Sequence, residues 1–157
     1  MVINLESISN QSIEIVKKAG EFIQQQLNNF NDSHIEIKGL NQLVSFVDIE
    51  TEKFLVKELG KLIPNSSFIT EEKTVEENKN AEYCWIIDPL DGTTNFMHKL
   101  PVYGISVALM HKNSLQIGIV YEINRNEIFN AILNNGAYLN NNPIQISKNK
   151  DLSQSLI

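Results

Sequence analysis

Two aspartates, Asp88 and Asp91, stand three positions apart where an apolar stretch of the sequence ends, and residues 92–94 read Gly-Thr-Thr. Glycine permits a tight turn or a close backbone approach, and either threonine can cap a short helix that begins near Asn95. The N–H groups at such a helix start point outward and bind phosphate. The spacing therefore predicts carboxylates and an anion site at the end of one strand.

Acids beside a bound phosphate imply a metal. In a cleft of low dielectric, two carboxylates would repel a phosphate by roughly several kcal/mol unless cations lay between them. Carboxylate oxygens are hard ligands, and the sequence places no set of histidine and cysteine ligands beside them. Such ligands favour magnesium over zinc, so we expect Mg²⁺ as the cofactor.

Three other kinds of acidic segment are alternatives to a magnesium site at residues 88–92. Asp-Pro and Asp-Gly are ordinary turn dipeptides, so a loop with capping acids accounts for the segment about as well as a metal site does. An EF-hand loop needs acidic or amide ligands at alternate positions, and Leu90 and Gly92 break that register. A haloacid-dehalogenase-type phosphatase needs a nucleophilic aspartate where this chain has Pro89. A covalent aspartyl mechanism is therefore excluded.

The elements that position these acids begin with two helices. Apolar residues spaced three or four positions apart predict a helix from about Leu5 to Phe30. A second helix is predicted over residues 49–63, with Asp48 as its N-cap and Pro64 beyond its end.

Beyond Ser66 the apolar residues alternate, as strands require. Pro89 cannot donate to a strand ladder, so the strand that begins at Tyr83 should end at about Asp88. The expected strands are residues 67–69, 83–87, 103–109, 115–123 and 127–133, and the expected turns are residues 112–113, 124–126 and 134–136. The pattern predicts an α+β fold, with two N-terminal helices packed on an antiparallel β-sheet, in a single domain over residues 1–157.

Composition limits the class of protein. With 157 residues, 42% of them hydrophobic, the chain can bury one core. A net charge of -6 argues against a nucleic-acid partner, because such partners are bound by clustered Lys and Arg. No apolar run approaches the ~20 residues that span a bilayer. The single cysteine, Cys84, fits a reducing compartment and a core position beside Trp85. We expect a soluble, cytoplasmic protein.

The segment Trp85–Phe96, which reads WIIDPLDGTTNF, closely resembles the metal-binding signature of the inositol monophosphatase family, and residues 97–101 resemble its continuation. Residues 67–72 resemble the family's Gly-Glu-Glu segment, with Thr70 in place of the usual glycine. Other stretches resemble the family's substrate-side loop and helix start, its hairpin and its next turn: residues 38–48, 118–121 and 136–140. The resemblance covers essentially all of this chain but only the family's first part, and it implies the first half of a layered αβαβα fold.

The resemblance also implies metal ligands. It assigns Glu71, Asp88 and the Leu90 carbonyl to one Mg²⁺, and Asp88 and Asp91 to a second, while Glu71 also holds a third ion through water. The activity implied is lithium-sensitive hydrolysis of a phosphate monoester by a metal-activated water, without a covalent intermediate.

Further residues take catalytic or binding roles by resemblance. Thr93, with Asp48 as its hydrogen-bond partner, resembles the pair that orients or deprotonates the attacking water, beside the metal ligand Glu71. The N–H groups of Gly92 and Thr93, together with Asp91, bind the phosphate. Lys38 resembles a lysine near the metal-bound waters, and the alternative is an exposed loop lysine surrounded by solvent.

The substrate is indicated by the residues after Gly92. Relatives acting on nucleotide bisphosphates tend to carry Lys-Glu after Gly-Thr, and fructose bisphosphatase-like members tend to carry Ser after Gly. Thr94 and Asn95 therefore favour inositol monophosphate or a related sugar or polyol phosphate, with fructose bisphosphate and nucleotide bisphosphates as alternatives.

In the family, the groups that contact substrate hydroxyls, and another metal ligand, come mostly from a later part of the protein. This chain ends at Ile157, so we expect a truncated phosphatase whose activity alone is incomplete. The alternative is an inactive module that binds metal or associates with partners. The sheet face that a later part would cover should stay apolar, and we expect a homo-oligomer, a dimer.

Overall fold

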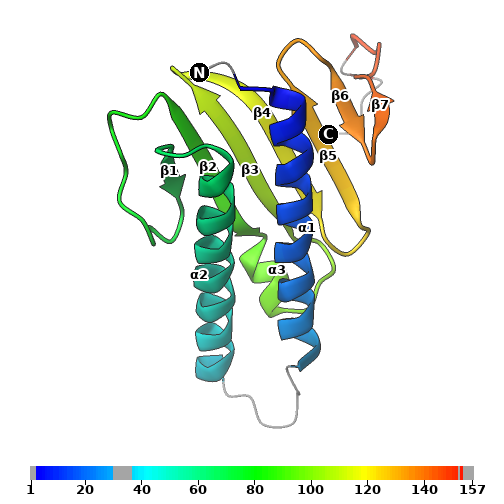
Figure 1. Cartoon of the computed structure of the whole chain (residues 1–157). Coiled ribbons are helices and arrows are strands. Elements are labelled where there is room, and N and C mark those ends of the chain that lie inside the picture. The colour runs from blue at the N-terminus through cyan, green and yellow to red at the C-terminus, as the bar shows by residue number, and fades with distance from the viewer. Residues whose placement is uncertain (1–2, 30–36, 152, 154–157) are drawn as a thin grey trace.

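The computed structural model of the chain describes residues 3–29, 37–151 and 153, and for residues 37–43 the backbone alone. In this part of the chain two long helices, α1 (Leu5–Asn29) and α2 (Ile37–Leu62), pack against each other and lie across one face of a β-sheet (Figure 1). A short helix, α3 (Thr93–Met97), contacts α2. The strands are β1 (Ser67–Thr70), β2 (Tyr83–Asp91), β3 (Gly104–His111), β4 (Ser114–Glu122), β5 (Glu127–Ile132), β6 (Ala137–Leu139) and β7 (Asn142–Ile144). The predicted α+β fold is confirmed.

The order of the strands in the sheet is their order in the chain, from β1 to β7. Neighbouring strands from β2 to β7 are antiparallel, as predicted. The connections from β3 to β6 fall at the predicted turns, whereas the strands β6 and β7 and the turn between them were not predicted. The prediction was wrong for β1, which pairs with β2 in parallel. Residues 71–82 carry the chain back along the sheet, and a connection of about a dozen residues is the length that a parallel pair needs.

Side chains between the helices and the sheet form the core. Gly20 allows α1 to approach the sheet closely, since a Cβ at that position would lie 2.5 Å from Cε1 of Tyr121. Cys84 is a buried free thiol beside the fully buried Trp85, as predicted. None of the helices in the described ranges is long and apolar enough to cross a membrane. The most deeply buried core residues include Val16, Ile23, Val47, Leu55, Leu59, Ile105, Leu109 and Ile119.

The face of the sheet turned away from α1 and α2 is apolar and exposed. Val120, Phe129 and Ile144 on this face are 47%, 37% and 39% exposed. Together with the small residues Gly118 and Ala131 they line an open groove of about 280 Å³. The face therefore has the apolar character that the sequence indicated, and self-association through it stays a prediction.

The second helix begins earlier than predicted. It starts at Ile37, so Asp48 lies in its interior and is not an N-cap. Val44, Val47 and Leu55 are buried on one side of this helix, which shows that the apolar stripe extends through the segment that the sequence assigned to a loop. The predicted end of the first helix, Phe30, lies outside the described residues.

The end of β2 also differs from the prediction. The strand continues past Pro89 to Asp91 because its register shifts between Asp88 and Asp91, so that Pro89 lies in an irregular part of the ladder where its missing N–H costs little. The following helix begins at Thr93 with Gly92 as its N-cap and no side-chain cap. Neither predicted threonine cap is therefore formed.

Candidate active site

The parallel pairing of β1 and β2 brings the carboxylates together. The carboxyl ends of parallel strands meet at the same edge of a sheet, and Thr70 at the end of β1 is paired with Ile87. The next residue on each strand is an acid, Glu71 after β1 and Asp88 within β2. Their side chains share a hydrogen bond, and Asp91 is close enough for its charge to act on Asp88.

The helix layer adds another carboxylate from above the sheet. Asp48 of α2 is only 5% exposed, and α2 packs against β2. Burial, followed by the charges of Glu72 and Glu71, raises the pKa of Asp48 to about 7. The charge of Asp88 acts in the same direction. The acid cluster therefore consists of Asp48, Glu71, Glu72, Asp88 and Asp91.

The strand residue Asp88 has a raised pKa for similar reasons. Burial is the largest cause, the charges of Glu71 and Asp91 come next, and together they raise the pKa of Asp88 to about 6. The N–H of Leu90 donates to Asp88 Oδ1 over 3.2 Å and opposes this shift. Carboxylates that raise one another's pKa values form a strongly negative site, which favours a divalent cation.

The donor set of the acid cluster suits Mg²⁺ in its chemistry, because it offers carboxylate and carbonyl oxygens. Among the described residues, however, no three His, Cys, Asp or Glu side chains are arranged so that they could hold a metal ion. Metal binding would require Glu71 and Asp88 to exchange their mutual hydrogen bond for bonds to the ion.

The turn after β2 is built around the Leu90 carbonyl and Gly92. Thr93 Oγ1 donates to the Leu90 carbonyl over 3.0 Å, so its hydroxyl donates there rather than to Asp48. Gly92 has a φ of 90°, and a Cβ at this position would lie 3.0 Å from the carbonyl oxygen of Val102. Glycine is therefore required both by the conformation and by the space.

Lys38 belongs by its backbone to the first turn of α2, and its side chain lies outside the part of the chain that is described. The loop that the resemblance places at residues 38–48 is thus helical in this structure.

Sequence reasoning missed Glu52, which is completely buried on α2 and contacts the segment that follows Glu71. Its carboxylate accepts hydrogen bonds from Glu72 and Thr74. Glu52 follows Asp48 by one helical turn, so the two carboxylates lie on the same side of the helix. That spacing was a usable signal, but it could be read only after residue 48 was known to be helical.

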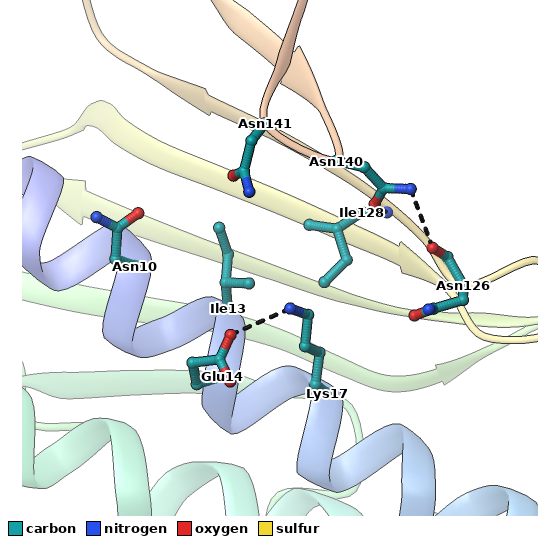
Figure 2. A pocket seen from close by; sticks show the side chains of 8 residues that line it. All are labelled: Asn10, Ile13, Glu14, Lys17, Asn126, Ile128, Asn140 and Asn141. Atoms are coloured by element: carbon teal, nitrogen blue, oxygen red, sulfur yellow. Dashed lines mark hydrogen bonds and ion pairs between the residues drawn. The ribbon is translucent and has the colours of Figure 1, made fainter.

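A larger cavity lies away from the acids. It has a volume of about 540 Å³ and opens between α1 and the turns that flank β5 and β6 (Figure 2). Lys17 and Glu14 from α1 form an ion pair of 3.1 Å at its side. The amide of Asn140 is bonded to the Asn126 carbonyl across its rim. No residue of the acid cluster lines this cavity. We therefore do not assign the chemistry to this cavity, although it is larger than the groove on the sheet face.

The raised pKa of Asp48 predicts the effect of pH on the metal-free protein. The folded state holds the Asp48 proton up to about pH 7, whereas an ordinary aspartate loses it near pH 3.8, so stability should fall as the pH rises through this window. In EDTA at pH 8, Asp48→Asn should therefore stabilise the chain by about 2 kcal/mol. Urea unfolding at pH 5 and pH 8 measures this effect, with the half-exposed Glu50→Gln as control. A destabilised Asp48→Asn variant at pH 8 would contradict it.

Comparison with known proteins agrees with this architecture. The profile of the inositol monophosphatase family matches residues 4–157. A protein named putative Nus factor SuhB from Neisseria meningitidis is 38% identical over 148 residues, 94% of this chain and 57% of that protein. Inositol monophosphatase 2 of Solanum lycopersicum is 36% identical over 157 residues, 98% of this chain and 58% of that protein.

Among solved structures, inositol monophosphatase from Anabaena (Nostoc) sp. PCC 7120 matches with a TM-score of 0.82 and 29% identity, covering 98% of this chain and 54% of that one. The chain thus spans little more than half the length of these relatives. Because the family profile extends over nearly all residues and the fold agrees with it, the chain belongs to the inositol monophosphatase family.

Proposed function

We propose that this chain carries the metal and phosphate sites of a Mg²⁺-dependent phosphatase acting on a small phosphate monoester. The observation that supports the proposal best is the approach of Glu71 and Asp88 at the ends of two parallel strands, with Asp91 and the buried Asp48 nearby. Such a group of acids would be costly to keep together for stability alone, and strongly perturbed carboxyl groups are typical of functional sites.

In this proposal the metal ligands are Glu71, Asp88, Asp91 and the Leu90 carbonyl. Bound Mg²⁺ would polarise the phosphoryl oxygens and lower the pKa of an attacking water. The Leu90 carbonyl is already oriented by the hydroxyl of Thr93, and Asp88 is oriented by the Leu90 N–H. A carbonyl oxygen has two lone pairs, so it can accept the Thr93 bond and also bind a cation.

Asp48 and Thr93 are the proposed proton-handling pair. With a pKa of about 7, Asp48 is suited to take up a proton near neutral pH. For the two residues to pair, the Thr93 hydroxyl would turn away from the Leu90 carbonyl. By family resemblance, the N–H groups of Gly92 and Thr93 bind the phosphate, with Asp91 beside them, and Lys38 stands near the metal-bound waters.

The proposed substrate is inositol monophosphate or a related sugar or polyol phosphate. Thr94 and Asn95 favour this class, and the tomato relative with 36% identity is named an inositol monophosphatase. Fructose bisphosphate and nucleotide bisphosphates are the competing substrates. We also propose that residues 1–157 form one α+β domain and that the chain forms a dimer, for which the exposed apolar sheet face is suited.

The proposal is tested by titrating residues 1–157 with inositol monophosphate in Mg²⁺ and in EDTA, and by measuring phosphate release. Binding should require Mg²⁺ and should be lost in Asp88→Asn. Turnover should be at least ~100-fold slower than that of the tomato enzyme assayed alongside, because residues 1–157 match 58% of that enzyme's length and the reaction rate depends on how fully the substrate is oriented. Equal affinity in Mg²⁺ and EDTA would overturn the proposal. Turnover equal to the tomato enzyme's would mean that a second copy of the chain completes the site.

A second candidate is a role without catalysis, as a metal-binding or association module. The relative with 38% identity that is named a putative Nus factor favours it, and so does the lack of a ready three-ligand group among the described residues. A folded chain that binds neither Mg²⁺ nor inositol monophosphate would support this second role.

A further inference from the structure

Glu52 is a carboxylate that no proposed catalytic step uses, although it is 0% exposed. Its Oε2 accepts a hydrogen bond of 2.7 Å from the N–H of Glu72. Its Oε1 accepts two bonds from Thr74, 2.8 Å from the N–H and 2.7 Å from the hydroxyl. A buried carboxylate without such partners would be very costly, so these bonds explain how the protein tolerates the charge.

Residues 72–74 adopt a backbone conformation that suits the Glu52 carboxylate. Lys73 lies between the two donating amides and has a φ of 54°, in the left-handed region. A residue in this conformation turns the N–H groups on its two sides toward a common point, which is the arrangement known as an anion nest. Here the anion is the protein's own carboxylate. Residues 72–74 are therefore held to α2 by hydrogen bonds to a buried side chain of that helix.

The hydrogen bonds between Glu52 and residues 72–74 lie directly beside a proposed metal ligand, Glu71. Glu71 is the residue before Glu72, and it is the first residue after β1, a four-residue strand paired only with β2 in the sheet. Residues 71–82 form no helix or strand. The backbone next to Glu71 is thus held on one side by the last pair of β1 and on the other by the bond from the Glu72 amide to Glu52.

We propose that Glu52 is a positioning residue for the acid cluster, which holds the backbone of Glu71 opposite Asp88 by filling the nest of residues 72–74. This inference rests on the proposed function for its consequence, the affinity for metal. Loss of a group that orients a metal ligand typically lowers metal affinity by ~10- to 100-fold, although the group never touches the ion.

A carboxylate is required at this position because both of its oxygens accept hydrogen bonds from the chain. Glutamine has the same shape, but its NH₂ group would face either the N–H of Glu72 or the two donors of Thr74. Glu52→Gln should therefore release one side of the nest. The matched control is Glu50→Gln on the same helix, which removes the same charge from a residue bonded to the exposed Lys53.

The first measurement is hydrogen exchange at individual backbone amides, which NMR monitors in the presence of EDTA. In Glu52→Gln the backbone amides of Glu72 and Thr74 should exchange at least ~10-fold faster than in Glu50→Gln, because the carboxylate that accepts their hydrogen bonds has been altered. Urea unfolding of both variants separately measures any change in global stability. Unchanged exchange at both amides would overturn the inference. This measurement does not depend on metal binding, so it remains decisive if the proposed function fails.

The second measurement is calorimetric titration with Mg²⁺. Glu52→Gln should bind at least ~10-fold more weakly than Glu50→Gln. Thr74→Val removes one donor at a half-buried position and leaves the core intact, so it should weaken binding by a smaller factor in a folded protein. Faster exchange with unchanged Mg²⁺ affinity would overturn the positioning role. If the unchanged chain binds no Mg²⁺, the proposed function fails, and the exchange rates of the Glu72 and Thr74 amides alone decide whether Glu52 holds this segment.

Discussion

The Asp88→Asn variant should bind Mg²⁺ at least ~100-fold more weakly than the unchanged chain, because it loses a charged ligand that both proposed ions share. Asp88 is the carboxylate on which Glu71 and Asp91 act most directly, and its pKa of about 6 reflects their negative charge. An amide keeps the size of the side chain but removes the charge that attracts the cation. Calorimetric titration at pH 7.5 measures the change.

The control for this variant is Glu76→Gln, which removes an exposed charge from residues 71–82 without touching the acid cluster. It should bind Mg²⁺ as the unchanged chain does, apart from a small screened effect. Equal affinities in Asp88→Asn and Glu76→Gln would reduce residues 88–92 to an ordinary turn with capping acids.

The Gly92→Ala variant should lose about 2–4 kcal/mol of stability. Two costs combine at this position. The left-handed φ of 90° disfavours a residue with a Cβ, and that Cβ would lie 3.0 Å from the Val102 carbonyl oxygen and 3.3 Å from the Tyr103 Cα. Both neighbours are backbone atoms, which cannot give way as a flexible side chain would. The turn should shift, and Asp91 and Thr93 on either side should shift with it.

The Gly136→Ala variant separates the cost of the left-handed φ from the cost of the close contact. Gly136 also has a positive φ, 81°, but nothing lies within 4 Å of the place where its Cβ would be. The free energy of unfolding of Gly136→Ala should therefore fall by only about 1 kcal/mol. Urea unfolding of both variants measures the difference, which is the cost of the contact with Val102. A Gly92→Ala variant as stable as Gly136→Ala would show that the turn after β2 adapts freely.

Much of the fold could be predicted from the sequence because it depends on local patterns. The alternation from Tyr103 to Ile132 and its asparagine-rich turns specify the antiparallel strands, since neighbours in the chain are neighbours in the sheet. The start of α2 could not be predicted in this way. Gly39 and the β-branched residues before Asp48 weaken the local helix signal, and burial of Val44 and Val47 against the rest of the protein outweighs it.

The candidate site was predictable in its residues more than in its arrangement. The motif around Asp88 and Asp91 identifies the chemistry, but the position of Glu71 beside Asp88 depends on the parallel pairing of β1 with β2, which no turn signal specifies. Glu52 was missed for a related reason. A single glutamate in a helix is normally solvated, and only the nest of residues 72–74 around it makes its burial possible.

The sheet order described above also affects how the chain can assemble. Each strand from β2 to β6 pairs with its successor in the sequence, so each pairing closes only a short loop and loses little chain entropy. The attachment of α1 is different, because its Gln24 side chain bonds to the Ile123 carbonyl 99 positions away. Closing that long loop becomes much less costly once β3 and β4 already hold Ile123 in place. The antiparallel strands can therefore form first and serve as a template on which the first helix docks.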